Sequence, residues 1–103
     1  MSDRLIKLEK LHAGDPKDPF LTYGIALEHG KAGRFDDAIA WLDKTLANDA
    51  GYAYAYFQKA KMLEHKGDTD AARAVLRIGM PAARAAGDAH AADEMMGFLE
   101  SLG

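Results

Sequence analysis

The feature that most constrains this chain is a repeat with a spacing of 34 residues. The stretch KAGRFDDAIAWL (31–42) aligns with HKGDTDAARAVL (65–76), and in both a glycine is followed by an alanine and then a leucine at the same positions. Periods of about 20 to 50 residues indicate stacked units, because one small helical unit cannot bury its apolar face alone. We therefore expect a row of similar units, each a helix–turn–helix.

Glycines, prolines and aspartates separate the helical segments. Asp18-Pro19 is a typical helix start, with a carboxylate at the N-cap and proline at the first helical position. Alanine, the best helix former, contributes much of the 49% hydrophobic content. The expected helices span about 2–13, 19–31, 35–48, 52–65, 69–86 and 88–102.

Two stretches complicate this pattern. GYAYAYF (51–57) alternates aromatic and small residues as a strand does, but its surroundings are helical, so we assign it to a helix start with Tyr56 in the core. Pro81 lies inside the helical pattern of 71–86, where a proline costs about 3 kcal/mol. The alternatives are one continuous, kinked helix and two shorter helices that meet near Gly79–Met80; we favour the continuous helix.

The repeated residues resemble the tetratricopeptide (TPR) repeat family, whose pattern is W-x2-L-G-x2-Y, then A-x3-F, then P. The matching positions are Thr22, Ile25, Ala26, His29, Ala38, Leu42 and Ala50 in the first unit, and Tyr56, Lys59, Ala60, Leu63, Ala72 and Leu76 in the second. The resemblance implies an all-α solenoid of antiparallel helix–turn–helix repeats in a single domain, 1–103, with about six helices. Its parts are an N-terminal half-repeat helix (1–17), repeat 1 (18–50), repeat 2 (51–86) and a C-terminal capping helix (87–103).

Composition argues against several classes of protein. The formal net charge is −3, so there is no basic stripe for nucleic acid, and the absence of cysteine excludes disulfides and thiolate metal sites. The N-terminal stretch MSDRLIKLEKL lacks the apolar core of a signal peptide, and no run of about 18 apolar residues predicts membrane insertion. We expect a cytoplasmic protein.

Signals for chemistry are weak. The four histidines include no H-E-x-x-H pair, the two serines, Ser2 and Ser101, lie at the termini, and the glycines form no phosphate-binding loop. We therefore expect no enzyme activity, no metal and no cofactor.

In the TPR family the first helix of each unit lines a concave groove that binds peptides or partner helices. Carried over by position, the resemblance implies a partner-binding groove lined by Phe20, Tyr23, Leu27, Lys31, Tyr54, Phe57, Lys61 and His65. Exposed aromatic residues beside lysines are typical of interaction hot spots. The structural alternative is that Phe20 and Tyr54 only seal helix ends, by packing against the half repeat and the first unit.

The family's lysine/asparagine/arginine clamp for terminal carboxylates is matched only at Lys61, which argues against a receptor for carboxylate tails. Residues 85–103 contain four acidic residues but no lysine or arginine, so either a basic partner or the protein's own basic second repeat, with Arg73, Arg77 and Arg84, could contact this helix. The predicted function is a non-catalytic protein–protein interaction module that binds a partner peptide or helix. The alternative is a self-associating accessory subunit or chaperone of a larger assembly or secretion machine. In that case the protein would form a homo-oligomer.

Overall fold

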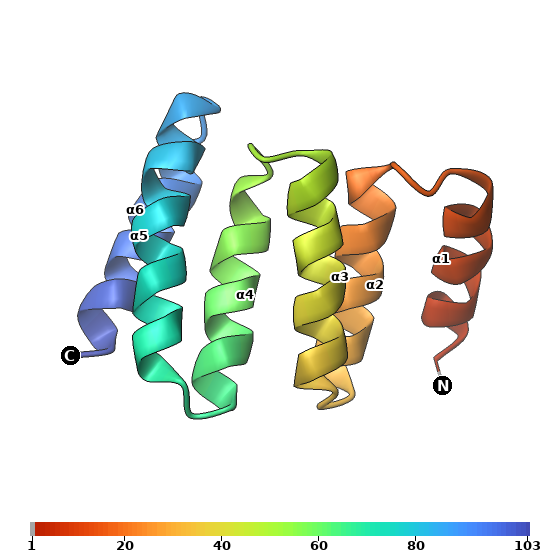
Figure 1. Ribbon diagram of the computed structural model, residues 1–103, viewed down its shortest axis with the longest axis horizontal. Helices are drawn as coiled ribbons and strands as arrows, with labels where there is room; N and C mark the ends of the chain where they lie inside the picture. Colours follow the sequence, from red (N-terminus) through yellow and green to blue (C-terminus); the bar gives the residue numbers. More distant parts are fainter. Residues whose placement is uncertain (1) are drawn as a thin grey trace.

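A computed structural model describes residues 2–103 as six α-helices joined by short turns, and Figure 1 shows them side by side with the two termini at opposite ends of the row. The helices are α1 (Asp3–Gly14), α2 (Pro19–Lys31), α3 (Phe35–Asn48), α4 (Ala53–His65), α5 (Thr69–Ala85) and α6 (Ala89–Ser101). The row measures 39 × 29 × 18 Å. The predicted all-α fold and its six helices are confirmed.

Three glycines end helices in the same way. Gly33, Gly67 and Gly87 all have φ between 77° and 83°, the left-handed region that favours glycine. The next residue donates its backbone N–H back to the helix, as Asp68 does to the Leu63 carbonyl at 2.9 Å. Asp68 and Asp88 then cap α5 and α6 through their side chains. The repeated glycine therefore marks the place where the chain reverses.

The buried residues form three clusters along the row. Leu5, Leu8, Leu21 and Ile25 join α1 to α2. The second cluster comprises Ala26, Ala38, Leu42, Ala55 and Met62, and the third comprises Ala53, Ala60, Ala72, Leu76, Met80, Ala83, Ala91, Ala92 and Met95. The matched alanines within the helices, Ala26, Ala38, Ala60 and Ala72, are fully buried, so the helices approach closely at these points, whereas Ala50 in the turn is exposed.

Thr22 stands where the family pattern has tryptophan, and its hydroxyl is buried. Its Oγ1 lies 2.8 Å from Thr45 Oγ1 and 3.1 Å from the Pro19 carbonyl oxygen, and its one hydrogen can be donated to either. Thr45 donates to the Trp41 carbonyl at 3.0 Å. Because these contacts satisfy the hydroxyl groups, α2 and α3 pack around a polar pair where the family places a bulky apolar residue.

Pro81 lies inside one continuous helix, α5, so the continuity that we favoured is confirmed and two shorter helices are excluded. The neighbouring Gly79 is buried at the point where α5 meets α4 and α6. A Cβ at this position would lie 2.5 Å from Tyr56 Cβ and 2.9 Å from Met95 Sδ. Tyr56 packs against the cluster that contains Leu76, as predicted.

Over residues 2–103, no helix combines the length and the apolar character needed to cross a membrane.

Candidate functional site

Aromatic side chains from α2, α4 and α6 meet on one side of the row. We call this surface the aromatic face and define it by Tyr23, Tyr52, Tyr54, Phe57 and Phe98. At its centre the Phe57 ring packs edge-on against Phe98, with centroids 5.8 Å apart, and lies 6.3 Å from Tyr54. These contacts join α4 to α6.

Lys61 extends the centre of the aromatic face by one turn of α4. Its Nζ lies 5.2 Å from the centroid of the Phe57 ring, within the range of a cation–π contact. The structure thus brings together three residues predicted from the sequence, Tyr54, Phe57 and Lys61. The lysine places a positive charge beside an apolar strip.

Helix α6 covers part of this surface. The Tyr54 hydroxyl donates to Glu94 Oε1 at 3.2 Å, and His90 Nε2 lies 2.6 Å from the same carboxylate oxygen. Burial raises the pKa of Tyr54, and its hydrogen bond to Glu94 adds to the rise. Tyr54 and Phe57 are consequently half-buried rather than exposed. Tyr54 thus packs against α6 as well as lying near Tyr23 of the first unit.

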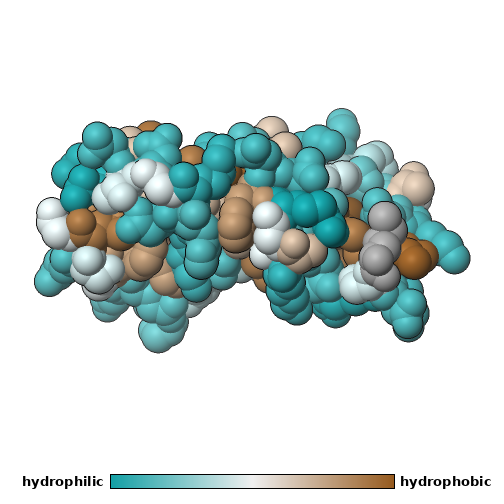
Figure 2. Space-filling view, turned by 90° about the horizontal axis from the view of Figure 1, so that it is seen from below, coloured by the Kyte–Doolittle hydropathy of each residue, from teal (hydrophilic) through white to brown (hydrophobic). Residues whose placement is uncertain are grey.

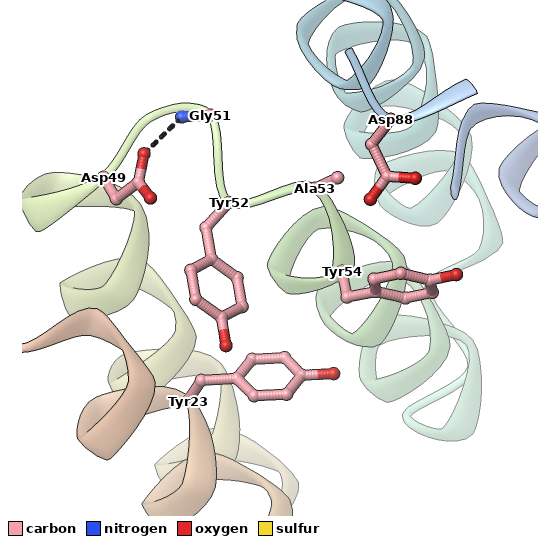
Figure 3. A pocket seen from close by; sticks show the side chains of 7 residues that line it. All are labelled: Tyr23, Asp49, Gly51, Tyr52, Ala53, Tyr54 and Asp88. Carbon is pink, nitrogen blue, oxygen red and sulfur yellow. Dashed lines mark hydrogen bonds between the residues drawn. The ribbon is translucent and has the colours of Figure 1, made fainter. Parts of the chain in front are cut away.

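A cavity of about 330 Å³ opens at the end of the aromatic face where the α3–α4 and α5–α6 turns lie (Figure 3). Its lining residues are Tyr23, Asp49, Gly51, Tyr52, Ala53, Tyr54 and Asp88. The Tyr23 and Tyr52 rings are tilted by 39° with centroids 4.9 Å apart. We call this cavity the tyrosine pocket.

The tyrosine hydroxyls of this pocket stay neutral at physiological pH. Burial raises the pKa of Tyr23 to about 12, and the neighbouring Tyr52 contributes to the rise. Burial also raises the pKa of Tyr52, and the carboxylates of Asp18 and Asp49 add to it. The formal charge of the pocket therefore comes from its aspartates.

A second cavity, of about 190 Å³, lies near the C-terminal end of α4 and is lined by Lys61, Glu64, His65 and Phe98. The His65 ring stacks on Phe35 of α3, with centroids 5.0 Å apart and planes 3° from parallel. His65 thus lies at the edge of the aromatic face, at the C-terminal end of α4. Figure 2, which views the molecule from below, shows apolar side chains there in small separate groups between hydrophilic ones.

Two of the predicted groove residues face α1 instead. Phe20, 62% exposed, borders a hollow between α1 and α2 together with Lys7 and Leu11. Lys31 Nζ lies 3.1 Å from Glu28 Oε2, and the Glu28 carboxylate also accepts from Ser2 of the α1 N-cap. Phe20 and Lys31 thus lie on the side of α2 that is next to α1.

The two remaining predicted residues on α2 lie differently. Leu27 is half-buried, whereas Tyr23 is in the tyrosine pocket. Of the eight residues predicted from the sequence, five line the aromatic face or its two cavities (Tyr23, Tyr54, Phe57, Lys61 and His65), whereas Phe20 and Lys31 lie beside α1.

Several residues of the site were missed from the sequence. The sequence predicts a capping helix at 87–103 whose acidic residues could meet a basic group, but not the contacts of Glu94 and Phe98 with α4. Tyr52 was assigned only as a helix start, whereas it is the N-cap of α4 and a wall of the pocket. The acidic run in the last helix, and the alternation in GYAYAYF, were the signals that pointed to these positions.

Within the described part of the chain, no three His, Cys, Asp or Glu side chains come together in a way that could hold a metal ion.

Comparisons with known proteins identify the fold but no close relative. No protein-family model matches the chain, and no curated protein sequence matches it. Solved structures do match. A protein of Bordetella parapertussis has a TM-score of 0.85 and 27% identity, over 99% of this chain and 89% of that one.

Two further structures are informative. A tetratricopeptide repeat domain protein of Salinibacter ruber has a TM-score of 0.79 and 28% identity, over 85% of this chain and 89% of that one. The type III secretion translocator chaperone SycD of Yersinia enterocolitica has a TM-score of 0.85 over 95% of this chain and 68% of that one. At 19% identity, the likeness to the chaperone shows the fold alone. The chain has the TPR-like fold that its repeat predicts.

Proposed function

We propose that this protein is a non-catalytic interaction module that binds an extended segment of a partner protein along the aromatic face. The observation that carries this proposal is the strip of Tyr54, Phe57 and Phe98, flanked by a cavity at each end. Aromatic residues supply large rigid contact areas, and interfaces are enriched in them.

The two cavities set the length of the segment. Tyr54 lines the tyrosine pocket and His65 lines the second cavity, so they are separated by 11 residues of α4, or about 16 Å along the helix axis. An extended chain covers this distance with about five residues. The bound segment therefore has two anchor side chains about five positions apart, with an apolar one in the cavity beside Phe98.

A second candidate function follows from the comparisons. The Yersinia structure is that of a secretion translocator chaperone, and its fold covers nearly all of this chain. An accessory subunit or chaperone of a secretion or assembly machine would use the same face to hold a segment of its client.

The test of the proposed function uses two variants of the aromatic face. Phe57→Ala removes the central ring, and Lys61→Glu reverses the charge beside it. Lys10→Glu is the matched control, because Lys10 is an exposed lysine of α1. Circular dichroism first establishes that all three variants fold.

Partners captured by the wild-type protein are identified by mass spectrometry, and their affinities for the variants are then measured by calorimetry. We expect Phe57→Ala and Lys61→Glu to weaken binding by about tenfold or more, which corresponds to about 1.4 kcal/mol. Lys10→Glu should bind as the wild type does. A partner that binds all four proteins with one affinity has its site elsewhere and refutes the proposal.

A further inference from the structure

We propose that the tyrosine pocket is a binding site for the guanidinium group of an arginine side chain. This inference rests on the proposed function, since the arginine belongs to the segment bound along the aromatic face. The arginine is the first of the two anchor side chains of that segment, and the apolar anchor binds in the second cavity. The inference follows from the walls of the pocket, their charge and the way the carboxylates are held.

Three of the seven residues that line the pocket are tyrosines. In Figure 3 the Tyr23 ring lies below Tyr52 and extends toward Tyr54, with Ala53 above the opening. Cations are attracted to the faces of aromatic rings, and guanidinium groups stack on them because both are planar. Three tyrosines around one cavity of about 330 Å³ can receive such a group.

The charge of the pocket is complementary to a cation. Asp49 and Asp88 come from two different turns and both line the cavity, and among the described residues its lining holds no lysine, arginine or histidine. Two carboxylates without a basic neighbour in the lining attract positive charge, and the low polarity of the ring walls strengthens the attraction. An anionic or purely apolar anchor fits this lining less well.

The backbone holds both carboxylates in place. Asp49 Oδ1 accepts from the Gly51 N–H at 3.0 Å, and Asp88 Oδ1 accepts from the Ala91 N–H at 3.0 Å. The carboxylates are thus oriented before a ligand arrives, which lowers the entropy cost of binding. A guanidinium has five N–H donors in a rigid plane and can bond to an aspartate while it stacks on a ring, whereas an ammonium is a point charge.

The test is an NMR titration of the ¹⁵N-labelled protein with N-acetyl-arginine amide. The control ligands are N-acetyl-citrulline amide, which has nearly the same shape without the charge, and N-acetyl-lysine amide, which has the charge without the plane. We expect saturable shifts at the backbone amides of Tyr23, Gly51 and Tyr54, and binding of the citrulline compound at least tenfold weaker. The lysine compound should bind several-fold more weakly than the arginine compound.

Variants locate the site. Asp88→Asn and Asp49→Asn remove charge, while asparagine keeps the ability to accept from the backbone N–H. Each should weaken arginine binding about threefold to tenfold. Asp37→Asn is the control, because Asp37 is an exposed carboxylate about 18 Å from Asp49 along α3, and it should change nothing.

Three results overturn the inference: equal shifts with the arginine and citrulline compounds, equal affinity for the arginine and lysine compounds, or unchanged binding to the Asp49→Asn/Asp88→Asn double variant. The titration uses no partner protein, so its outcome is separate from the test of the proposed function. If the arginine compound binds but Phe57→Ala does not weaken partner binding, the arginine site is supported and the proposed partner-binding surface is refuted. If the arginine compound does not bind but Phe57→Ala weakens partner binding, the partner-binding surface is supported and the arginine site is refuted.

Discussion

Gly79 is the position at which the packing of α5 is most sensitive to one added methyl group. It is buried, and an alanine Cβ would lie 2.5 Å from Tyr56 Cβ and 2.9 Å from Met95 Sδ. The Met95 thioether can rotate away, but Tyr56 Cβ is fixed to the α4 backbone. Gly79→Ala therefore requires α5 and α4 to move apart.

The net effect is the difference between two terms. Alanine in place of glycine inside a helix contributes about 1 kcal/mol of stability. Overpacking of a tight core costs about 1–3 kcal/mol, and contacts this short belong to the upper end of that range. We expect Gly79→Ala to lower the free energy of unfolding by about 1–2 kcal/mol, which lowers the Tm of a chain of this size by about 5–15 °C.

Gly97 provides the matched control. It lies in α6, and a Cβ there meets nothing within 4 Å. Gly97→Ala should therefore raise the free energy of unfolding by up to about 1 kcal/mol through helix propensity alone. Urea unfolding followed by circular dichroism measures both variants. If Gly79→Ala is as stable as Gly97→Ala, the close packing of α5 on α4 is wrong.

Three further substitutions test separate parts of the structure. Thr45→Val keeps the shape of the side chain but removes the buried contact with Thr22, and should lower the free energy of unfolding by about 1 kcal/mol in urea titrations, whereas no change would mean that the pair is not formed. Gly67→Ala places a side chain at φ 83° and should cost about 1 kcal/mol in thermal unfolding; an unchanged Tm would contradict the left-handed turn. Glu28→Gln tests a pH effect: the hydrogen bond from Lys31 lowers the folded-state pKa of Glu28 below its ordinary 4.5, so its contribution is present above that pH and lost as the pH falls through the folded-state pKa. The variant should lose stability at pH 7 and show a shallower decline on acidification, and parallel stability curves would contradict this.

The fold could be predicted because it depends on local signals that recur. The glycine–alanine–leucine spacing fixes where each hairpin turns and where its helices touch, and both follow from the covalent chain. Thr22 is an exception, because the residue that compensates for it, Thr45, is on another helix. Nothing in the repeat pattern indicates that pairing.

The site was less predictable because it depends on contacts between helices that are not neighbours in sequence. Helix α5 has 17 residues where α3 has 14, so α6 begins 36 residues after α4, whereas α4 begins 34 residues after α2. The pairs Phe57–Phe98 and Tyr54–Glu94 are 41 and 40 residues apart, so a carry-over at the 34-residue period does not bring them together. Similarly, the contacts of Phe20 with α1 depend on how the first helix lies against the second.

The most direct test of the central claim is to map where a selected ligand binds. Random linear peptides are displayed and selected against the wild-type protein, and the best peptide is titrated into the ¹⁵N-labelled chain. We expect the shifted amides to cluster around Tyr54, Phe57, Lys61 and Phe98, and binding to weaken about tenfold in Phe57→Ala. Shifts confined to α1 or α3, with full binding by Phe57→Ala, would contradict the account.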